Sequence, residues 1–335
     1  MKRREFLALA ACMPWLSVSA ADARLPGVHV FGRLPQPDAV RRVFAAGAPA
    51  AVLVHAVAPD KLLGWPWALS AEALAMLAPA YRSLPLLGRL AGRGSTMPLE
   101  RLVALAPDLI IDSGTVDANY LSAAERVHQQ TGIPYVLIDG RLADSARQLR
   151  DAGQLLGAPA RGDMLARHAQ AALPACDPAR RPENPRVYLA RAADGLETPL
   201  PGSVNGECIE AACATNVARG KGGLARVSLE QLLVWAPDAI VTQSAEFFAL
   251  ARQDASWQGI AAVRNGRLLL APSLPFGWLD GPPGINRLIG VSWLGQRLRE
   301  AEPATGWIER AQDFHRVFYG HAPSREQLAP SLGAG

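Results

Sequence analysis

Short apolar runs alternate with segments of helical hydrophobic spacing along most of the chain. The apolar runs have the length of buried parallel strands, and the segments between them repeat apolar residues at intervals of three and four. Alternation of this kind predicts parallel, doubly wound α/β sheets. Strands are expected at residues 29–31, 52–55, 86–87, 109–112 and 135–139, and then at 187–190, 239–242 and 268–270.

One segment occurs twice. Residues 99–111 read LERLVALAPDLII and residues 229–241 read LEQLLVWAPDAIV, with seven of thirteen positions identical. Each copy predicts a short amphipathic helix, a stop at Pro107 or Pro237, and a buried strand. Two copies about 130 residues apart indicate two similar α/β lobes and not a solenoid of small repeats.

The starts of these two helices carry capping signals. Ser228 with Gln231 predicts a capping box in the second copy. Thr96 is expected to cap the first copy.

The length of 335 residues suits two domains. Residues 142–173, broken at 157–159, predict a helical segment that carries the chain across once, and everything after Asn286 is expected to stay with the second lobe. The expected organisation is a signal peptide over 1–20, a first lobe over 21–141, a linking segment over 142–175, a second lobe over 176–322 and a tail over 323–335.

The N-terminus predicts export. Lys2, Arg3 and Arg4 precede an apolar run, and small residues suit cleavage after Ala20. The Arg3-Arg4 pair also resembles a twin-arginine signal. A second interpretation is a lipoprotein signal that ends in a lipid-bearing Cys12.

Composition and charge exclude some partners. Half of the residues are hydrophobic and 19% are charged, which indicates an ordinary folded core. The formal net charge is +4, and the first twenty residues supply about half of it. A nearly balanced body does not favour nucleic acid binding.

Three cysteines follow the predicted signal peptide: Cys176, Cys208 and Cys213. One disulfide and one free buried thiol are expected in an oxidising compartment, and the spacing leaves the pairing open.

Enzyme motifs are missing from the sequence. It contains no G-x-S-x-G elbow, no Walker loop and no H-E-x-x-H pair. The six histidines are scattered, so a bare metal ion held by several of them is not expected. We therefore expect a protein that is not an enzyme, with no cofactor of its own; a two-lobed metal-dependent enzyme is the alternative.

Aromatic and arginine side chains lie near the predicted strand ends instead. Such side chains in a cleft suit a bulky, planar or anionic ligand through stacking, cation–π contacts and forked hydrogen bonds. The expected ligand-binding residues are His55, Trp65, Trp67, Arg89, Arg93, Phe248, Phe276 and Trp278.

Several motifs between about residues 27 and 300 resemble the periplasmic binding proteins for vitamin B12 and ferric siderophores. The paired Leu-Glu…Pro-Asp segments are the most specific of them. The motifs are residues 97–111, 131–134, 202–203, 216–218, 257, 262–267, 275–278, 282–283 and 286–288.

This resemblance implies the substrate-binding component of an ABC importer for iron complexes or cobalamin. Two lobes joined by one long helix would hold the ligand between them, and Glu100 and Glu230 would dock onto arginines of the permease. It further implies a periplasmic protein, expected as a monomer, with an ABC permease and its ATPase as partners.

The implied ligand is a small-molecule metal complex. A ferric siderophore comes first, and heme or a corrinoid next. Cys213 matches one cysteine of the pair found in B12-binding relatives, but Gly295 stands at the other position, which weakens a cobalamin assignment. An oxyanion such as molybdate or tungstate is the alternative, because arginines and helix N-termini also hold bare oxyanions.

Overall fold

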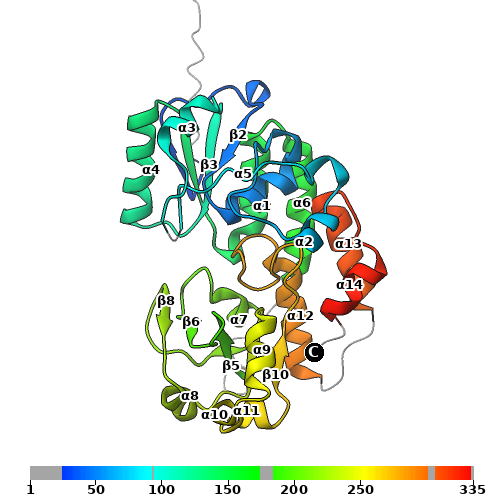
Figure 1. Ribbon diagram of the computed structural model, residues 1–335. Helices are drawn as coiled ribbons and strands as arrows, with labels where there is room; N and C mark the ends of the chain where they lie inside the picture. Colours follow the sequence, from blue (N-terminus) through cyan, green and yellow to red (C-terminus); the bar gives the residue numbers. More distant parts are fainter. Residues whose placement is uncertain (1–24, 93, 174–183, 301–305, 333–335) are drawn as a thin grey trace, which may run out of the picture.

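The computed structural model describes residues 25–92, 94–173, 184–300 and 306–332. The predicted signal peptide and Cys12 lie outside these residues, as do Arg93 and Cys176. Figure 1 shows two α/β lobes stacked along the long axis of the molecule.

Each lobe is built on a four-stranded sheet. The first has the order β1-β4-β3-β2, with β1 antiparallel to β4 and the other pairs parallel. The second has the order β10-β9-β5-β7 and is parallel throughout. The predicted fold class, two α/β lobes with mostly parallel sheets, is confirmed. The strands are β1 (Val28–Phe31), β2 (Val43–Ala45), β3 (Leu109–Gly114), β4 (Tyr135–Asp139), β5 (Arg186–Ala190), β6 (Glu197–Pro199), β7 (Thr215–Asn216), β8 (Leu224–Arg226), β9 (Ala239–Thr242) and β10 (Leu268–Leu270).

The helices pack on the two sheets, and each helix turns its apolar side chains toward the sheet. Large aliphatic residues of the helices and the strands belong to the same buried clusters, which is the usual way that an α/β layer removes apolar surface from water. The helices are α1 (Ala48–Val57), α2 (Ala71–Ala75), α3 (Leu99–Ala104), α4 (Ala118–Thr131), α5 (Ser145–Leu155), α6 (Pro159–Ala172), α7 (Glu207–Ala211), α8 (Leu229–Trp235), α9 (Ala245–Ala251), α10 (Ala255–Gln258), α11 (Ala261–Arg264), α12 (Arg287–Arg299), α13 (Trp307–Tyr319) and α14 (Arg325–Leu332).

The repeated segment forms α3 with β3 in one lobe and α8 with β9 in the other. The two lobes also share strand register. Val43 of β2 pairs with Leu109 of β3, and Val187 of β5 pairs with Ala239 of β9. Because Leu109 and Ala239 are equivalent in the repeat, the lobes are equivalent in their central strands as well.

The Pro-Asp of the first copy joins the helix to the neighbouring strand. The Asp108 carboxylate accepts hydrogen bonds from the backbone N–H groups of Arg41 and Arg42, at 2.7 and 2.8 Å. The Arg42 guanidinium donates to the carbonyls of Leu105 and Ala106, which end α3. One aspartate therefore fixes the start of β2, and one arginine caps the end of α3.

The second copy repeats this arrangement. The Asp238 carboxylate accepts from the backbone N–H of Arg186 at 2.7 Å, and the Arg186 guanidinium donates to the carbonyls of Trp235 and Ala236. Ala236, like Ala106 in the first copy, has a left-handed backbone, with φ of 44° and 43°. The identical Ala-Pro-Asp sequence thus ends the helix and anchors the neighbouring strand in both lobes. We call this arrangement, an aspartate bonded to strand N–H groups and an arginine bonded to the carbonyls at the helix end, the clamp.

The linking segment forms two helices, α5 and α6, with the predicted break between them. They pack closely because two glycines face each other: a Cβ on Gly153 would lie 2.9 Å from the Cα of Gly162. The end of α6 contacts the second lobe, where the Ser292 hydroxyl of α12 donates to the carbonyl of Ala172.

The expectation that the chain after Asn286 stays with the second lobe is wrong. Figure 1 shows α13 and α14 beside α2 and α6 of the first lobe. Arg161 of α6 donates to the carbonyl of Phe318, and Gln327 donates to the carbonyl of Ala75. The reason is hydrophobic: α13 buries Trp307, Phe318 and other side chains in the core that the first lobe shares with it.

Three local predictions are also wrong. Residues 52–55 lie in helix α1, because a run buried on all sides has no periodicity that separates helix from strand. Leu86 makes only an isolated bridge with Trp65. Pro98 precedes α3 without a side-chain cap, and the Thr96 hydroxyl accepts from the backbone N–H of Arg89 instead. The capping box of Ser228 and Gln231 is confirmed.

The cysteines follow the expected pattern. Cys213 is disulfide-bonded, and Cys208 is free and fully buried. Burial raises the pKa of the Cys208 thiol to about 12, so this thiol is unreactive at neutral pH.

The clamp makes a stability prediction. Asp108→Ala and Asp238→Ala should each lower the free energy of unfolding by about 1–3 kcal/mol, because charge-assisted bonds to backbone N–H groups are lost. Urea denaturation measures the change. Asp313→Ala, which removes an exposed ion pair on α13, is the control and should cost about 0–1 kcal/mol. Equal stability of all four proteins would refute the clamp.

Candidate functional site

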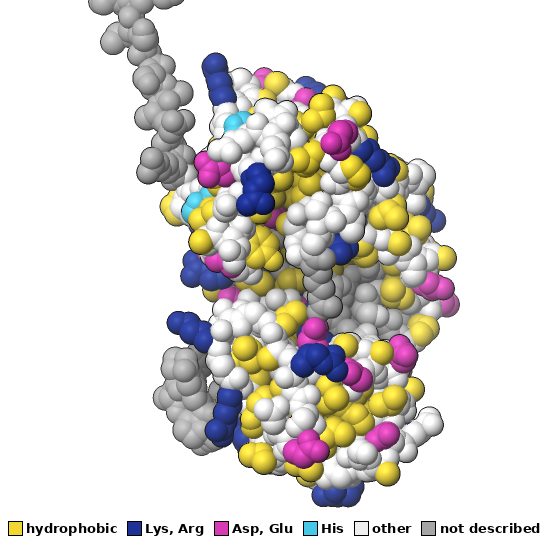
Figure 2. All heavy atoms as spheres, turned by 60° about the vertical axis from the view of Figure 1, so that its left-hand side comes forward, with side chains coloured by type: hydrophobic (Ala, Val, Ile, Leu, Met, Phe, Trp, Pro, Cys, Tyr) yellow, Lys and Arg dark blue, Asp and Glu magenta, His cyan; other side chains and the backbone are white. Residues whose placement is uncertain are grey.

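A cavity of about 200 Å³ opens at the carboxyl ends of the central strands of the second lobe. In the parallel order β10-β9-β5-β7, connections leave β5 and β9 in opposite directions, and open α/β sheets bind ligands at such a point. Figure 2 shows the molecule hollowed between the two lobes, with charged side chains at the rim. The lining residues are Leu189, Ala190, Arg191, Ala192, Gln243, Ser244, Asp280 and Gly281.

Arg191 and Asp280 form the charged part of the lining. The Arg191 guanidinium pairs with the Asp280 carboxylate and, at 3.1 Å, with Glu197. The amide of Asn205 also donates to Asp280. Burial raises the pKa of Asp280 to about 6, while Arg191 and Asn205 oppose that rise. Both carboxylates share the single guanidinium of Arg191, so this polar wall has no excess positive charge.

Gln243 positions the loop that carries Asp280. Its side-chain carbonyl accepts hydrogen bonds from the backbone N–H groups of Leu279 and Asp280, at 3.2 and 2.6 Å. Because Gln243 directly follows β9, the cavity wall is tied to the end of a rigid strand.

The loop over residues 271–286, which we call the interlobe loop, reaches from the second lobe into the first. The Phe276 ring lies 5.7 Å from Trp65, 6.1 Å from His55 and 5.2 Å from Tyr319, measured between ring centroids. Further along the loop, a Cβ on Gly284 would lie 3.5 Å from the Cα of Pro49, in the first turn of α1. The loop that lines the cavity is therefore anchored in the first lobe.

Arg287 fixes the end of the interlobe loop. Its guanidinium is fully buried and donates to the carbonyls of Gly140, Val204 and Gly284. Glu207 pairs with it at 3.4 Å and also accepts from the backbone N–H of Leu142 at 2.7 Å. Gly140 and Leu142 belong to the first lobe, so this cluster joins the two lobes.

On the first lobe, the described residues 88–92 and 94–97 belong to a loop that is bonded to the end of β2. The backbone N–H groups of Leu90 and Ala91 donate to the carbonyl of Ala46, directly after β2. Arg89 lies in this loop and donates from Nε to the carbonyl of Gly94 at 3.0 Å. The strand predicted at 86–87 is absent among the described residues, so Arg89 follows no strand directly and lies in a loop bonded to the end of β2. Arg93 lies outside the described residues.

Four predicted ligand-binding residues are buried in the protein core. His55, Trp65, Phe276 and Trp278 are each 1–2% exposed. The first three pack against one another, and Trp278 lies 6.1 Å from Trp307 of α13. Their aromatic faces are covered by protein, so the prediction that they line an open cleft is wrong.

The two remaining predicted aromatics are half-buried. Trp67 packs at the edge of the aromatic cluster, against Trp65 and Phe276. Phe248 lies on α9, where the Arg252 guanidinium stacks over its ring at 5.4 Å. Phe248 does not line the cavity described above.

Sequence reasoning missed Arg191, Gln243 and Asp280. A signal for the first two was present, because they follow directly after predicted strands at 187–190 and 239–242. Asp280 gives no such signal, since the interlobe loop that places it has no periodic pattern.

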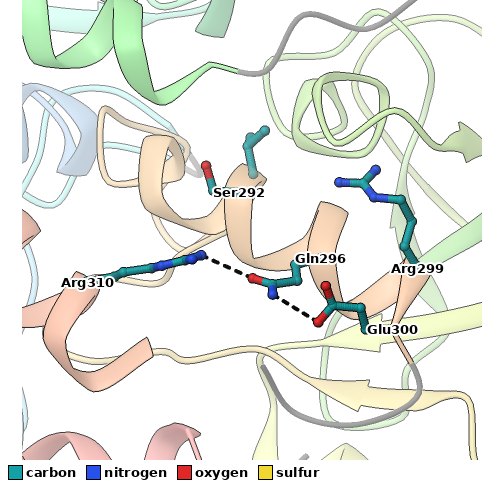
Figure 3. A pocket seen from close by; sticks show the side chains of 6 residues that line it. Ser292, Gln296, Arg299, Glu300 and Arg310 are labelled. Atoms are coloured by element: carbon teal, nitrogen blue, oxygen red, sulfur yellow. Dashed lines mark hydrogen bonds between the residues drawn. The ribbon is translucent and has the colours of Figure 1, made fainter. Parts of the chain in front are cut away.

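A second pocket, of about 340 Å³, lies between α12 and α13 (Figure 3). Its polar groups bond to one another: Arg310 donates to Gln296 at 3.1 Å, and Gln296 donates to Glu300 at 2.9 Å. Arg299 points away from this chain of bonds. The pocket is not at the carboxyl ends of either sheet, and we do not assign a ligand to it.

Glu100 and Glu230 are both exposed, in the first turns of α3 and α8. Hydrogen bonds from the Ser228 hydroxyl and from backbone N–H lower the pKa of Glu230, so its carboxylate is charged at neutral pH. Neither residue lines the cavity.

The described residues contain no group of three or more histidine, cysteine, aspartate or glutamate side chains that could hold a metal ion. No helix among them has the length and apolarity needed to cross a membrane.

The buried histidine makes a pH prediction. Burial lowers the pKa of His55 from 6.5 to about 4, so the folded protein keeps the ring neutral while the unfolded chain protonates it below pH 6.5. Stability is therefore lost as the pH falls, by about 2 kcal/mol for this group between pH 7 and pH 5. His55→Phe should remove that part of the loss in urea titrations at the two pH values. His168→Phe, at an exposed position, is the control, and an unchanged loss in His55→Phe would contradict the assignment.

Comparisons with known proteins agree with this architecture. A solute-binding protein of an ABC transporter from Sulfurospirillum deleyianum has a TM-score of 0.78 and 24% identity, covering 90% of this chain and 95% of that one. Molybdate-bound MolA of Haemophilus influenzae has a TM-score of 0.65 and 21% identity, covering 87% and 96%. The vitamin B12-binding protein BtuF of Vibrio cholerae has a TM-score of 0.59 and 21% identity, covering 78% and 97%.

These similarities are below 25% identity and show the fold. A comparison with curated proteins gave no match. A family model described as periplasmic binding protein matches residues 54–274, which is most of the chain. The chain therefore belongs to the periplasmic binding protein family.

Proposed function

We propose that this protein is the substrate-binding component of an ABC importer, which captures a compact, oxygen-rich metal anion in the periplasm and delivers it to a permease and its ATPase. The observation that carries the proposal is the cavity at the ends of β5 and β9, which Asp280 and Gly281 of the interlobe loop line on one side. Open α/β sheets bind small molecules at this place, and membership of the periplasmic binding protein family supports a carrier role.

The size of the cavity selects among ligands. Pockets for drug-sized molecules measure about 300–1,000 Å³, and this cavity of about 200 Å³ is smaller. Heme or a corrinoid would need more space and free aromatic faces to stack on, whereas Trp65 and Phe276 are buried. A metal oxyanion such as molybdate or tungstate is small enough for a cavity of this volume.

Two features of the first lobe would attract an anion, the N-terminus of α1 and Arg89, and the Asp112 carboxylate opposes them, because a Cβ on Gly47 before α1 would lie 3.6 Å from its Oδ1. Helix α1 begins directly after β2, has no acidic residue in its first turn, and carries a partial positive charge at its N-terminus. Arg89 lies in the loop that is bonded to the end of β2. An anion between the lobes would face this side and, on the other, a wall of Gln243, Ser244 and Arg191, in which Asp280 and Glu197 offset the charge of Arg191.

A ferric siderophore is the second candidate. Part of the loop that follows residue 88 is exposed, at Gly92, Gly94, Ser95 and Thr96. A larger anionic chelate would place only part of its structure in the cavity and the rest against such exposed loop residues.

Calorimetry with a panel of ligands tests the proposal. Molybdate, tungstate and a ferric siderophore should be compared with hemin and cyanocobalamin, with sulfate as the control anion. A ligand of the proposed class should raise the free energy of unfolding by about 2.7 kcal/mol at a hundred times its Kd. Binding of hemin or cyanocobalamin, with none of the metal anions, would contradict the proposed ligand class.

Arg89 offers a matched pair of variants. Arg89→Ala should weaken binding of the anion by about 1–3 kcal/mol, the range for a hydrogen bond to a charged group. Arg252→Ala, on α9 and outside the cavity, is the control and should bind normally. Equal affinity of the two variants would exclude Arg89 from the site.

We also propose that Glu100 and Glu230 dock onto basic residues of the permease. They are exposed at equivalent positions of the two lobes, which suits a partner with two similar halves. Exposed ion pairs are worth about 0–1 kcal/mol each, so single changes should be mild. The double charge reversal Glu100→Arg with Glu230→Arg should abolish uptake and leave ligand affinity unchanged. Full uptake by the double variant would refute docking through these residues.

A further inference from the structure

The two helices that carry the docking glutamates also expose aliphatic side chains. Val103 on α3 is 49% exposed, and Leu233 and Val234 on α8 are 52% and 78% exposed. Val103 and Leu233 occupy the same position in the repeat, three residues after Glu100 and Glu230. Residues three apart lie on one face of a helix, so each acid has an aliphatic neighbour beside it on the surface.

Exposure alone does not distinguish these side chains. Val30, Leu86 and Leu250 are 43–55% exposed, and single exposed aliphatics are common on protein surfaces. Val103 and Leu233 differ from these residues because they occupy the same position in both copies of the repeat. The inward residue of each helix, Leu102 or Leu232, is fully buried, and the outward face presents an acid and an aliphatic side chain in both lobes. Figure 1 shows α3 in one lobe and α8 in the other, both on the left-hand side of the view, whereas α13 and α14 lie on the right.

Charge alone gives a weak attachment. Both glutamates are exposed, and exposed ion pairs are screened by salt. They can steer the encounter and set its register, but a longer-lived complex needs apolar surface to be buried.

We propose that Val103, Leu233 and Val234 are apolar anchors that insert into the permease beside its contacts with Glu100 and Glu230. The proposal rests on the proposed function and adds the chemistry of the partner surface. Each half of the permease presents a basic residue and, about one helical turn away, an apolar socket. The socket facing α8 is the larger, because α8 exposes two aliphatic side chains and α3 exposes Val103 followed by Ala104.

The test measures binding to the permease–ATPase complex of this importer, reconstituted in lipid nanodiscs. Val103→Ser should weaken the complex about 10-fold, and Leu233→Ser with Val234→Ser should weaken it further, since burial of one aliphatic side chain is worth about that factor or more. The control is Leu86→Ser with Leu250→Ser, which removes equally exposed aliphatics outside the repeat and should change affinity less than about 2-fold.

Salt dependence separates the two kinds of contact. The aliphatic variants should bind more weakly but keep the dependence of affinity on ionic strength, because both glutamates remain. The charge-reversed Glu100→Arg with Glu230→Arg should lose that dependence. Ligand affinity of every variant, measured with the anion from the panel that binds, should equal that of the wild type.

The outcomes distinguish the two proposals. If the glutamate variant loses binding while the aliphatic variants bind like the wild type, the apolar anchors proposed here do not exist and the proposed importer role stands. If the aliphatic variants weaken no more than the Leu86 and Leu250 control, the anchors are also wrong. If the wild type does not bind the permease complex, the importer role itself fails.

Discussion

The buried guanidinium of Arg287 is the interaction on which the arrangement of the two lobes depends. A buried charge is costly unless it is paired and hydrogen-bonded, and Arg287 meets this need from both lobes at once, through Gly140 on one side and Val204 and Glu207 on the other. Separation of the lobes would take the Gly140 carbonyl away from the guanidinium and leave a buried cation with one acceptor fewer. The same residue begins α12, so it also holds the end of the interlobe loop.

The interlobe loop connects this junction to the candidate site. One part of it, Asp280 and Gly281, lines the cavity, and another part places Phe276 among His55, Trp65 and Tyr319. A ligand that moved the cavity wall would therefore have to move a ring packed in the first lobe. Together with the return of α13 to that lobe, this arrangement favours a site formed before the ligand arrives, with little movement of the lobes.

The sequence was informative wherever one segment sufficed to specify the structure. The repeat predicted α3 with β3 and α8 with β9, and the capping box at Ser228 was correct, because these elements depend on neighbours within a few residues. Prediction from the sequence failed where contacts between distant segments determine the structure. Residues 52–55 form a helix inside the core, and Trp65 and Phe276 are buried because the interlobe loop and α13 cover them. None of the predicted arginine and aromatic residues lines the cavity; Arg191, Gln243 and Asp280 do.

The proposed ligand site lies between the lobes, at the carboxyl ends of β5 and β9. Its most direct test is a crystal structure of the protein with tungstate, with diffraction data collected at the tungsten absorption edge. We expect one strong anomalous peak in the cavity lined by Arg191, Gln243 and Ser244. A peak in the pocket between α12 and α13, with none in the cavity, would contradict it.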